Sequence, residues 1–562
     1  MARGTTIPIR SAGALALCLR IAPAYAGAHE ETGVEEAPGP EVFFDRPEVF
    51  SDRLVRPSSA AQDLLRLAGI RGQRPLPPLL GETRLVRGHG GATSLEATEL
   101  WWIPPIAEAR WNSGLAYGPN DGSMWGGRGW NQRITAGAGL TRGVLRLRLL
   151  PELTYHQNLD FQTLPNPLDW RYDPWASPWH TDPESLDLPS RFGAEPFGAV
   201  GLGQSSIALA WQGLEVGLTA SEQWWGPGIR NAIVLSNHAG GIPRAYIRTD
   251  APLRTRGGDI EFAWFSGRLE GSGLFLLERI APRSISAAAL AWSPWFEPAL
   301  TLGATRAVFA PGEGGRFPLA GFFDVFRDVG RPNDRPVTDP ERPEAPDALF
   351  SLFARWALPN DGAEIYAEWA RNERPKSPRD LLARPGHSQA YTIGGQWSNP
   401  VGGPGLLRIQ AEATTLEQDD DLVGRREVSF YKSRVVPHGY THRGRVVGAA
   451  IGPGASSQWL AVDYLGELWG IGLTGSRIRW ENDTMYNVFP YRTPVGHDVS
   501  LLGGVRAHAK AFGVQVSAHY EGGPRLNYLF QNESPALSDI NAVDVINHSL
   551  RVQIEWAHRP RQ

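Results

Sequence analysis

The chain has 562 residues, a formal net charge of −4 and one cysteine. This mildly acidic composition gives no reason to expect a nucleic-acid partner. The mean hydropathy is −0.28 and, beyond the N-terminus, no apolar run reaches the ~18 residues of a membrane-spanning helix. Any membrane role must therefore use strands closed into a barrel, because backbone N–H and C=O groups must be paired within hydrocarbon.

The first 26 residues have the parts of a secretory signal peptide. A basic start without acids is followed by a small, apolar stretch and by the cleavage site Ala24-Tyr25-Ala26. Arg20 interrupts the apolar stretch, so an amphipathic N-terminal helix is the alternative. Cys18 lies inside this segment, and the mature chain is therefore expected to have no thiol for a disulfide, a nucleophile or a metal site.

Residues 27–100 are expected to form a periplasmic segment with one short helix. The stretch from Ser58 to Gly69 begins with serines that can cap a helix, continues with good helix formers and stops at a glycine. Its apolar side chains need a partner surface. We therefore expect it to pack with the proline-rich residues 75–78 and to plug the periplasmic mouth of a barrel.

Period-two alternation recurs over most of residues 101–562 and predicts an all-β chain. In residues 407–414 one face is wholly apolar and the other wholly polar, and residues 514–520 and 551–556 repeat the pattern. Further stretches share this alternation: residues 144–149, 206–211, 214–219, 259–265 and 364–370. A soluble β-sandwich or propeller alternates as well, so periodicity alone leaves both open.

Two features favour a membrane barrel. Aromatic residues make up 10% of the chain, and many lie near predicted strand ends, as an aromatic girdle requires: Trp101, Trp102, Tyr117, Trp211, Trp264, Trp369, Tyr520 and Trp556. Tight turns such as Asn360-Asp361-Gly362 contrast with excursions at residues 157–203, 311–347 and 482–498, which we interpret as extracellular loops. Residues 101–562 are thus predicted to form a transmembrane antiparallel β-barrel of about 18 strands.

The densest cluster of residue types that suit sugar binding lies between residues 221 and 244. Indole faces cover the C–H patch of a pyranose, while amide and guanidinium groups bond its hydroxyls. The alternative is that the indoles are girdle or packing residues and that the glycines set a turn. The cluster contains Trp224, Trp225, Gly226, Gly228, Asn231, Asn237 and Arg244.

Several motifs together resemble the Wzi capsule-assembly family. The central one is Trp224-Trp225-Gly226-Pro227-Gly228, followed by Leu235-Ser236-Asn237. The others fall in the family's order, and the resemblance covers most of the mature chain. The chain departs from the pattern in ending on Pro560-Arg561-Gln562 and in its long excursion at residues 311–347. The further motifs are Gly118-Pro119-Asn120-Asp121-Gly122, Asp187-Leu188-Pro189-Ser190-Arg191-Phe192-Gly193, Gly439-Tyr440-Thr441-His442-Arg443-Gly444 and Ile451-Gly452-Pro453-Gly454.

The resemblance implies a bacterial outer-membrane barrel that acts as a lectin-like organiser of capsular or exopolysaccharide. It implies no catalysis and no cofactor. The expected partners are the polysaccharide and outer-membrane lipid, and the expected state is a monomer. From residue type and motif position we predict a carbohydrate-binding surface on the extracellular face, made of Trp224, Trp225, Asn231, Asn237, Arg244, Tyr440, His442 and Arg443.

Other functions remain open at this stage. A transport porin would use the same barrel with an open polar channel, and a third option is a purely structural barrel. A hydrolase would need two facing carboxylates. Glu412, Glu417 and the acidic run at residues 419–421 are weak candidates for them. The acidic run is more typical of a solvated loop, or of a calcium site. His438 and His442 would bring two metal ligands together on a helix, but the neighbouring proline and glycine indicate a turn.

Overall fold

The computed structural model describes residues 53–86, 98–181, 184–278, 281–312, 319–326, 346–372, 378–418, 428–485, 496–531 and 543–556. These residues belong to one compact unit, residues 42–562. The predicted signal peptide at residues 1–26 and the acidic run at residues 419–421 lie outside the described residues, as do parts of the excursions at 311–347 and 482–498.

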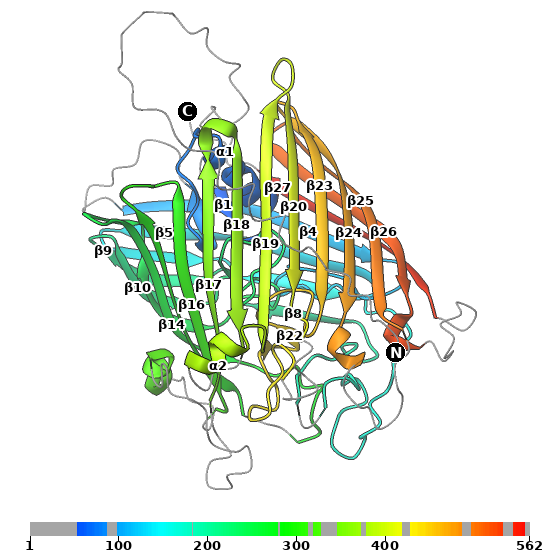
Figure 1. Ribbon diagram of the computed structural model, residues 1–562. Helices are drawn as coiled ribbons and strands as arrows, with labels where there is room; N and C mark the ends of the chain where they lie inside the picture. Colours follow the sequence, from blue (N-terminus) through cyan, green and yellow to red (C-terminus); the bar gives the residue numbers. More distant parts are fainter. Residues whose placement is uncertain are drawn as a thin grey trace, which may run out of the picture. The chain divides into compact units, whose positions relative to one another are not determined.

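The strands close into an antiparallel β-barrel (Figure 1). Among the described residues the barrel has 18 strands, which confirms the predicted fold class. Three strands are interrupted and consist of two segments each: β6 with β7, β8 with β9, and β12 with β13. The last strand, β27, pairs with the first, β4, and this pairing closes the barrel.

The wall segments are β4 (Thr98–Asn112), β5 (Gly129–Arg142), β6 (Leu145–Leu149), β7 (Glu152–His156), β8 (Phe197–Gly201), β9 (Ser206–Trp211), β10 (Leu214–Thr219), β12 (Arg244–Thr249), β13 (Leu253–Thr255), β14 (Gly258–Leu269), β15 (Arg283–Pro294), β16 (Leu300–Ala310), β17 (Asp347–Leu358), β18 (Ala363–Arg371), β19 (Gln389–Pro400), β20 (Leu406–Thr415), β23 (Ser456–Leu465), β24 (Trp469–Trp480), β25 (Asp498–Ala511), β26 (Val514–Leu526) and β27 (Val545–Trp556). Every stretch predicted as a strand from its alternation lies in one of them, apart from Val144, which precedes β6.

The wall has its polar side chains inside and its apolar side chains outside. In β20, Arg408, Gln410 and Glu412 are buried, whereas Ile409 and Ala411 between them are exposed. A soluble sandwich would bury the apolar face, so this inverted pattern decides between the folds that periodicity left open. The exposed apolar face is the one that lipid covers in a membrane barrel.

Connections between strands are short at one end of the barrel and long at the other, within the part of the chain that the structure describes. We call these the short-turn end and the long-loop end; the hairpin of β19 and β20 marks the short-turn end at the top of Figure 1. The predicted turn at Gly362 lies at this end, with a left-handed φ of 61°. The excursions predicted at residues 157–203, 311–347 and 482–498 all join strands at the long-loop end, which confirms the predicted contrast.

Exposed aromatic side chains gather near the short-turn ends of the strands, among them Trp102, Trp211 and Trp556 from the predicted girdle. Among the other members of the predicted girdle, Trp101 and Tyr117 do not face the membrane. Trp101 faces inward and packs against Leu54 and Ile103. Tyr117 lies in a loop and packs against the buried cluster of the lumen.

The N-terminal segment contains the predicted helix, α1 (Ala60–Ile70). Ser59 caps it by accepting a hydrogen bond from the backbone N–H of Gln62, and the helix passes the predicted glycine stop by one residue because Arg71 is its C-cap. As expected, Leu76 of the proline-rich stretch packs against the helix. No helix in the described residues is long and apolar enough to cross a membrane.

The apolar side chains of α1 face the inside of the wall, where they contact Ala357, Leu406 and Leu465. Short strands frame the helix: β1 (Arg53–Val55) pairs with β3 (Arg84–Val86), and β2 (Leu80–Glu82) pairs with β11 (Gln223–Trp225) from a long loop. The boundaries at residues 27–100 and 101–562 and the plugging role stay predictions.

Candidate functional site

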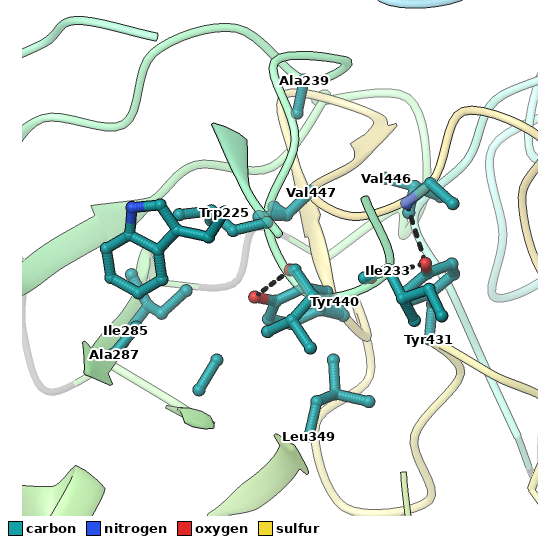
Figure 2. Close-up of a cluster of buried hydrophobic side chains, with 14 of the residues drawn as sticks. Trp225, Ile233, Ala239, Ile285, Ala287, Leu349, Tyr431, Tyr440, Val446 and Val447 are labelled. Atoms are coloured by element: carbon teal, nitrogen blue, oxygen red, sulfur yellow. Dashed lines mark hydrogen bonds between the residues drawn. The ribbon is translucent and has the colours of Figure 1, made fainter. Parts of the chain in front are cut away.

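Loops from the long-loop end turn back into the lumen and pack against one another (Figure 2). Two of them, residues 220–243 and the described residues 416–418 and 428–455, share the largest buried apolar cluster with the wall. Hydrogen bonds join the loops: Tyr440 Oη donates to Val234 O at 2.8 Å, and Tyr431 Oη donates to Ile233 O at 2.7 Å. The cluster includes Trp225, Ile233, Leu235, Tyr431, Tyr440 and Val446 from the loops and Phe265, Ile285, Ala287 and Leu349 from the wall.

Carboxylates on the inner wall hold the loop of residues 220–243. Glu412 accepts hydrogen bonds from three consecutive backbone N–H groups, those of residues 229–231, and from Tyr366 Oη at 2.8 Å. Glu368 accepts from the backbone N–H of Ile233 at 3.1 Å. Glu412, weighed above as a weak hydrolase candidate, is thus fully engaged in fixing a loop; charge-assisted bonds of this kind are strong.

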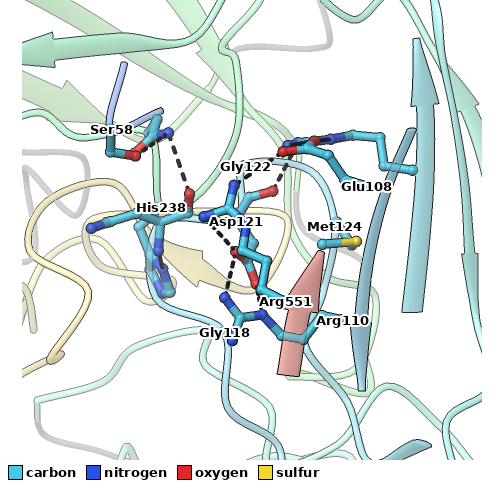
Figure 3. Close-up of polar contacts among 12 residues, drawn as sticks. Ser58, Glu108, Arg110, Gly118, Asp121, Gly122, Met124, His238 and Arg551 are labelled. Atoms are coloured by element: carbon cyan, nitrogen blue, oxygen red, sulfur yellow. Dashed lines mark hydrogen bonds and ion pairs between the residues drawn. The ribbon is translucent and has the colours of Figure 1, made fainter. Parts of the chain in front are cut away.

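A buried network of arginines and carboxylates joins the N-terminal segment, a loop and the wall (Figure 3). Arg56 donates to Glu108 at 2.8 Å, and Arg551 contacts the same carboxylate at 3.0 Å. Asp121, from the loop after β4, lies between Arg110 at 2.9 Å and Arg551 at 3.5 Å. Buried charges are tolerated when they are paired, and removing one partner of such a pair is strongly destabilising.

The predicted residues Trp224, Trp225 and Arg244 are buried in the contacts between the loop and the N-terminal segment. The two indoles belong to β11, where Trp224 Nε1 donates to Gly228 O at 3.0 Å and the ring of Trp225 meets that of Phe265 at 5.5 Å. The guanidinium of Arg244 donates to Ser221 O at 2.7 Å and pairs with the carboxylate of Glu82 at 3.0 Å. All three side chains therefore help to position the loop.

Asn231 and Asn237 are buried as well. Asn231 donates from Nδ2 to Thr414 Oγ1 at 3.2 Å, a bond to the inner wall. Asn237 donates from Nδ2 to Pro57 O at 3.1 Å and accepts from Ser58 Oγ at 3.1 Å, so it binds the residues just before α1.

The second predicted group lies around the hairpin of β21 (Thr441–His442) and β22 (Arg445–Val446). Tyr440 and His442 are buried, and the backbone N–H of Glu270 donates to His442 Nδ1 at 3.1 Å. Burial, together with the nearby positive charge of Arg443, holds the pKa of His442 well below its ordinary value. Arg443 itself has 54% of its side chain exposed and donates to the Glu270 carboxylate at 2.7 Å.

Seven of the eight predicted binding residues are therefore buried, and Arg443 alone among them is exposed. The structure brings the first five together around one loop and the N-terminal segment. It places the other three at a different hairpin. The assignment of these residues to glycan binding stays a prediction.

A cavity of about 190 Å³ lies at the long-loop end, between the ends of β23, β24 and β26 and the loops beside them. We call it the outer cavity. Asn231 is the predicted binding residue that lines it. Aromatic faces and hydrogen-bond donors line it together, a combination that suits a saccharide: Tyr117, Trp125, Phe192, Trp480, Arg230, His238, Arg445 and Arg525.

A further aromatic group, not among the predicted binding residues, lies in the loop of residues 157–196. Trp170 is 72% exposed there, and the guanidinium of Arg191 lies over the ring of Trp175, with its central carbon 5.2 Å from the ring centroid. The signal was available, because these tryptophans are close in sequence and fall inside a predicted extracellular loop.

Among the described residues, no three His, Cys, Asp or Glu side chains gather as a metal site would need, at His438 and His442 or elsewhere. Burial lowers the pKa of His438 to about 3, and Arg283 nearby adds to the shift. Both rings therefore act as neutral groups in a packed loop.

A family model described as "Capsule assembly protein Wzi" matches residues 151–466. Among solved structures, the chain is similar to Wzi of Escherichia coli, described as an outer membrane protein involved in group 1 capsule assembly and a carbohydrate-binding β-barrel. The TM-score is 0.51 at 11% identity, over 81% of this chain and 85% of that one.

Two porin-like structures are less similar. OccK5 of Pseudomonas aeruginosa has a TM-score of 0.39 at 9% identity, over 82% of this chain and 98% of that one. A BenF-like porin from Pseudomonas fluorescens Pf-5 has a TM-score of 0.33 at 11% identity, over 82% and 99%. No curated protein matches the sequence significantly.

Proposed function

The chain belongs to the Wzi capsule assembly family, and from this premise we propose that it binds capsular or exopolysaccharide and organises its attachment at the cell surface. It is a protein of the bacterial outer membrane. Outer-membrane barrels have short periplasmic turns and longer extracellular loops, so the long-loop end is the end that meets the polysaccharide.

The outer cavity is the observation that carries this proposal. It opens among the loops of the long-loop end, and aromatic faces and amide, imidazole and guanidinium donors line it. Stacking on rings combined with several hydrogen bonds recognises a pyranose without transforming it. In the proposal Asn231 and Trp480 contact sugar inside the cavity, while Arg443 and Trp170 contact the polymer on the exposed loops.

The remaining predicted residues serve the same function indirectly. Trp224, Trp225, Asn237 and Arg244 fix one inward-folded loop against the N-terminal segment, and Tyr440 and His442 fix the other loops. Preorganised loops lower the entropic cost of binding a flexible polymer.

The same proposal gives the N-terminal segment, residues 27–100, the role of a plug at the short-turn end. Helix α1 contacts the inner wall, and Arg56 binds Glu108 of the wall. The barrel works as a monomer in lipid, because its exposed apolar face suits hydrocarbon over the whole circumference.

Polysaccharide retention on cells tests the proposal. A deletion strain is complemented with the wild-type chain, with Trp480→Ala, with Trp170→Ala, or with Trp397→Ala as a control on the lipid-facing wall. Cell-bound and released polysaccharide are then measured. We expect the deletion to release polysaccharide into the medium, the wild type and Trp397→Ala to restore retention, and the two test variants to restore it only in part.

Heat-modifiable gel migration shows whether each variant has folded. Normal retention in the deletion strain would contradict the proposal and leave a purely structural barrel. Full retention in folded Trp480→Ala and Trp170→Ala would show that the binding residues lie elsewhere.

A further inference from the structure

A second cavity, of about 230 Å³, lies deeper in the lumen, between α1 and the short-turn halves of β23 to β27. We call it the inner cavity. Its volume far exceeds the ~10–15 Å³ that one water molecule requires, so it has room for a larger solute. The helix supplies Asp63 and Arg66 to its lining, and the wall supplies Arg408 and Arg506.

The lining of the inner cavity is strongly basic. It contains seven arginines and three carboxylates. Part of this charge is compensated: Arg408 contacts Asp63 at 2.9 Å and Asp463 at 2.9 Å, and Arg66 pairs with Glu364. Guanidinium groups held in a region screened from water favour anions, and their forked geometry suits a carboxylate.

Leaving aside Arg408 Nη1, which lies 2.9 Å from the Asp63 carboxylate, three donor groups of the lining have no hydrogen-bond partner among the described residues. They are Arg66 Nη2, Arg355 Nε and Trp459 Nε1, on three side chains that are each at least 91% buried. Arg355 is notable among the lining arginines because its one hydrogen bond, from Nη1 to Pro77 O at 3.0 Å, goes to a neutral carbonyl. Buried donors without partners are costly, so they mark a position where a ligand or ordered water supplies acceptors.

Trp459 stands where the two cavities meet. It lines both of them, together with Arg230 and Pro119. The guanidinium groups of Arg230 and Arg506 lie over its ring, with their central carbons 5.2 Å and 5.5 Å from the ring centroid. These two guanidinium groups add positive charge to the lining at the place where the cavities meet.

We infer that the inner cavity is a binding site for an acidic sugar unit, one that carries a carboxylate on a pyranose ring. Arg355 and Arg66 bind the carboxylate, and the indole N–H of Trp459 donates to a ring hydroxyl. This inference rests on the proposed function in one respect: that function is the reason for taking the ligand to be a sugar. The inner cavity would thus select acidic sugar units over neutral ones, a preference that the outer cavity alone does not explain.

Equilibrium binding to the purified full chain in detergent tests this site. The probes are galacturonate and digalacturonate, with galactose as the neutral counterpart, and heat is measured by titration calorimetry. We expect the acidic sugars to bind, galactose to bind at least tenfold more weakly, and the acidic binding to weaken as salt rises.

Matched variants locate the site. Trp459→Phe keeps an aromatic ring but removes the unpartnered N–H together with part of the ring surface, and Arg355→Gln removes a charge without breaking an ion pair. Each is expected to weaken galacturonate binding by about tenfold, the effect of losing one hydrogen bond to a charged or buried group. Trp397→Phe and Arg477→Gln, on the outer face of the wall, are the controls and should bind like the wild type.

Equal binding of galactose and galacturonate would overturn the inference, and so would binding that Trp459→Phe and Arg355→Gln leave unchanged. The two proposals fail separately. If the deletion strain sheds polysaccharide but the purified chain binds no acidic sugar, the inner site is wrong and the proposed function stands. If the chain binds galacturonate at the inner cavity but the deletion strain sheds no polysaccharide, the inner site stands and the proposed function is wrong.

Discussion

Glu412 holds the loop of residues 220–243 through three consecutive backbone N–H groups. In Glu412→Gln the charge is lost and one of the acceptor oxygens becomes a donor. We expect the free energy of unfolding in detergent to fall by about 1.5–3 kcal/mol, the range for hydrogen bonds to charged groups. Glu195→Gln, on an exposed loop position, is the matched control. Identical denaturation curves for the two variants would show that Glu412 does not anchor the loop.

Asp483, at the long-loop end, is expected to make the free energy of unfolding depend on pH. Its buried carboxyl accepts from the backbone N–H of Gln418 at 2.8 Å and from Ser429 Oγ at 2.7 Å, and burial raises its pKa from 3.8 to about 7. The folded state therefore binds the proton more tightly than the unfolded state, so this carboxyl lowers the free energy of unfolding as pH rises from 3.8 to about 7.

The variant Asp483→Asn keeps a neutral group at this position and removes the titration. The difference in unfolding free energy between Asp483→Asn and the wild type should grow across that window, in favour of the variant. Denaturation midpoints measured at its two limits check the sign. A difference that is constant with pH would mean that folding does not change the pKa of Asp483.

At the scale of elements, apolar contact helps to hold α1 inside the barrel. Leu67 is fully buried in the cluster that the helix shares with the wall. Leu67→Ala should weaken the docking of the helix by about 2–5 kcal/mol, as for other buried leucines. Hydrogen exchange of residues 60–70 should speed up, while the wall strands stay protected. Leu149→Ala, on the exposed face of β6, should leave the exchange of the helix unchanged.

The strands could be predicted from sequence because alternation is a local signal. Residues 206–211 and 214–219 coincide with β9 and β10, and the helix from its serine cap was found within a residue or two. The surroundings of the Trp264 side chain could not be predicted from the sequence. Trp264 was expected in the girdle, but a 3₁₀ helix at Leu319–Phe326 covers it, with the ring of Phe322 at 4.2 Å. This contact joins residues far apart in the sequence, which periodicity does not report.

The burial of the candidate site residues was harder to predict than the strands, and for a physical reason. Composition singled out residues 221–244, but it does not tell whether a loop points out to solvent or folds back into the lumen. Trp225 and Asn237 are buried because the N-terminal segment and the inner wall offer partners to them. In this structure the indoles of Trp224 and Trp225 make packing contacts, which was the alternative to sugar binding.

At the scale of the whole molecule, loops from one end and the N-terminal segment from the other meet in the lumen. The pairing of β2 with β11 and the contacts of Arg56 with Glu108 and Glu222 join these parts to each other and to the wall. A porin of the same strand number would need this space for water and solute. Because loops and the N-terminal segment occupy much of this space, the structure favours holding a polymer over passing a solute.

Conductance across a planar lipid bilayer tests this account most directly. The intact chain, reconstituted after its folding has been verified by heat-modifiable migration, is compared with a chain that lacks residues 53–86. We predict no steady large conductance from the intact chain and a clear increase when the N-terminal segment is removed. Steady large conductance from the intact chain would contradict the account and would make the barrel a porin.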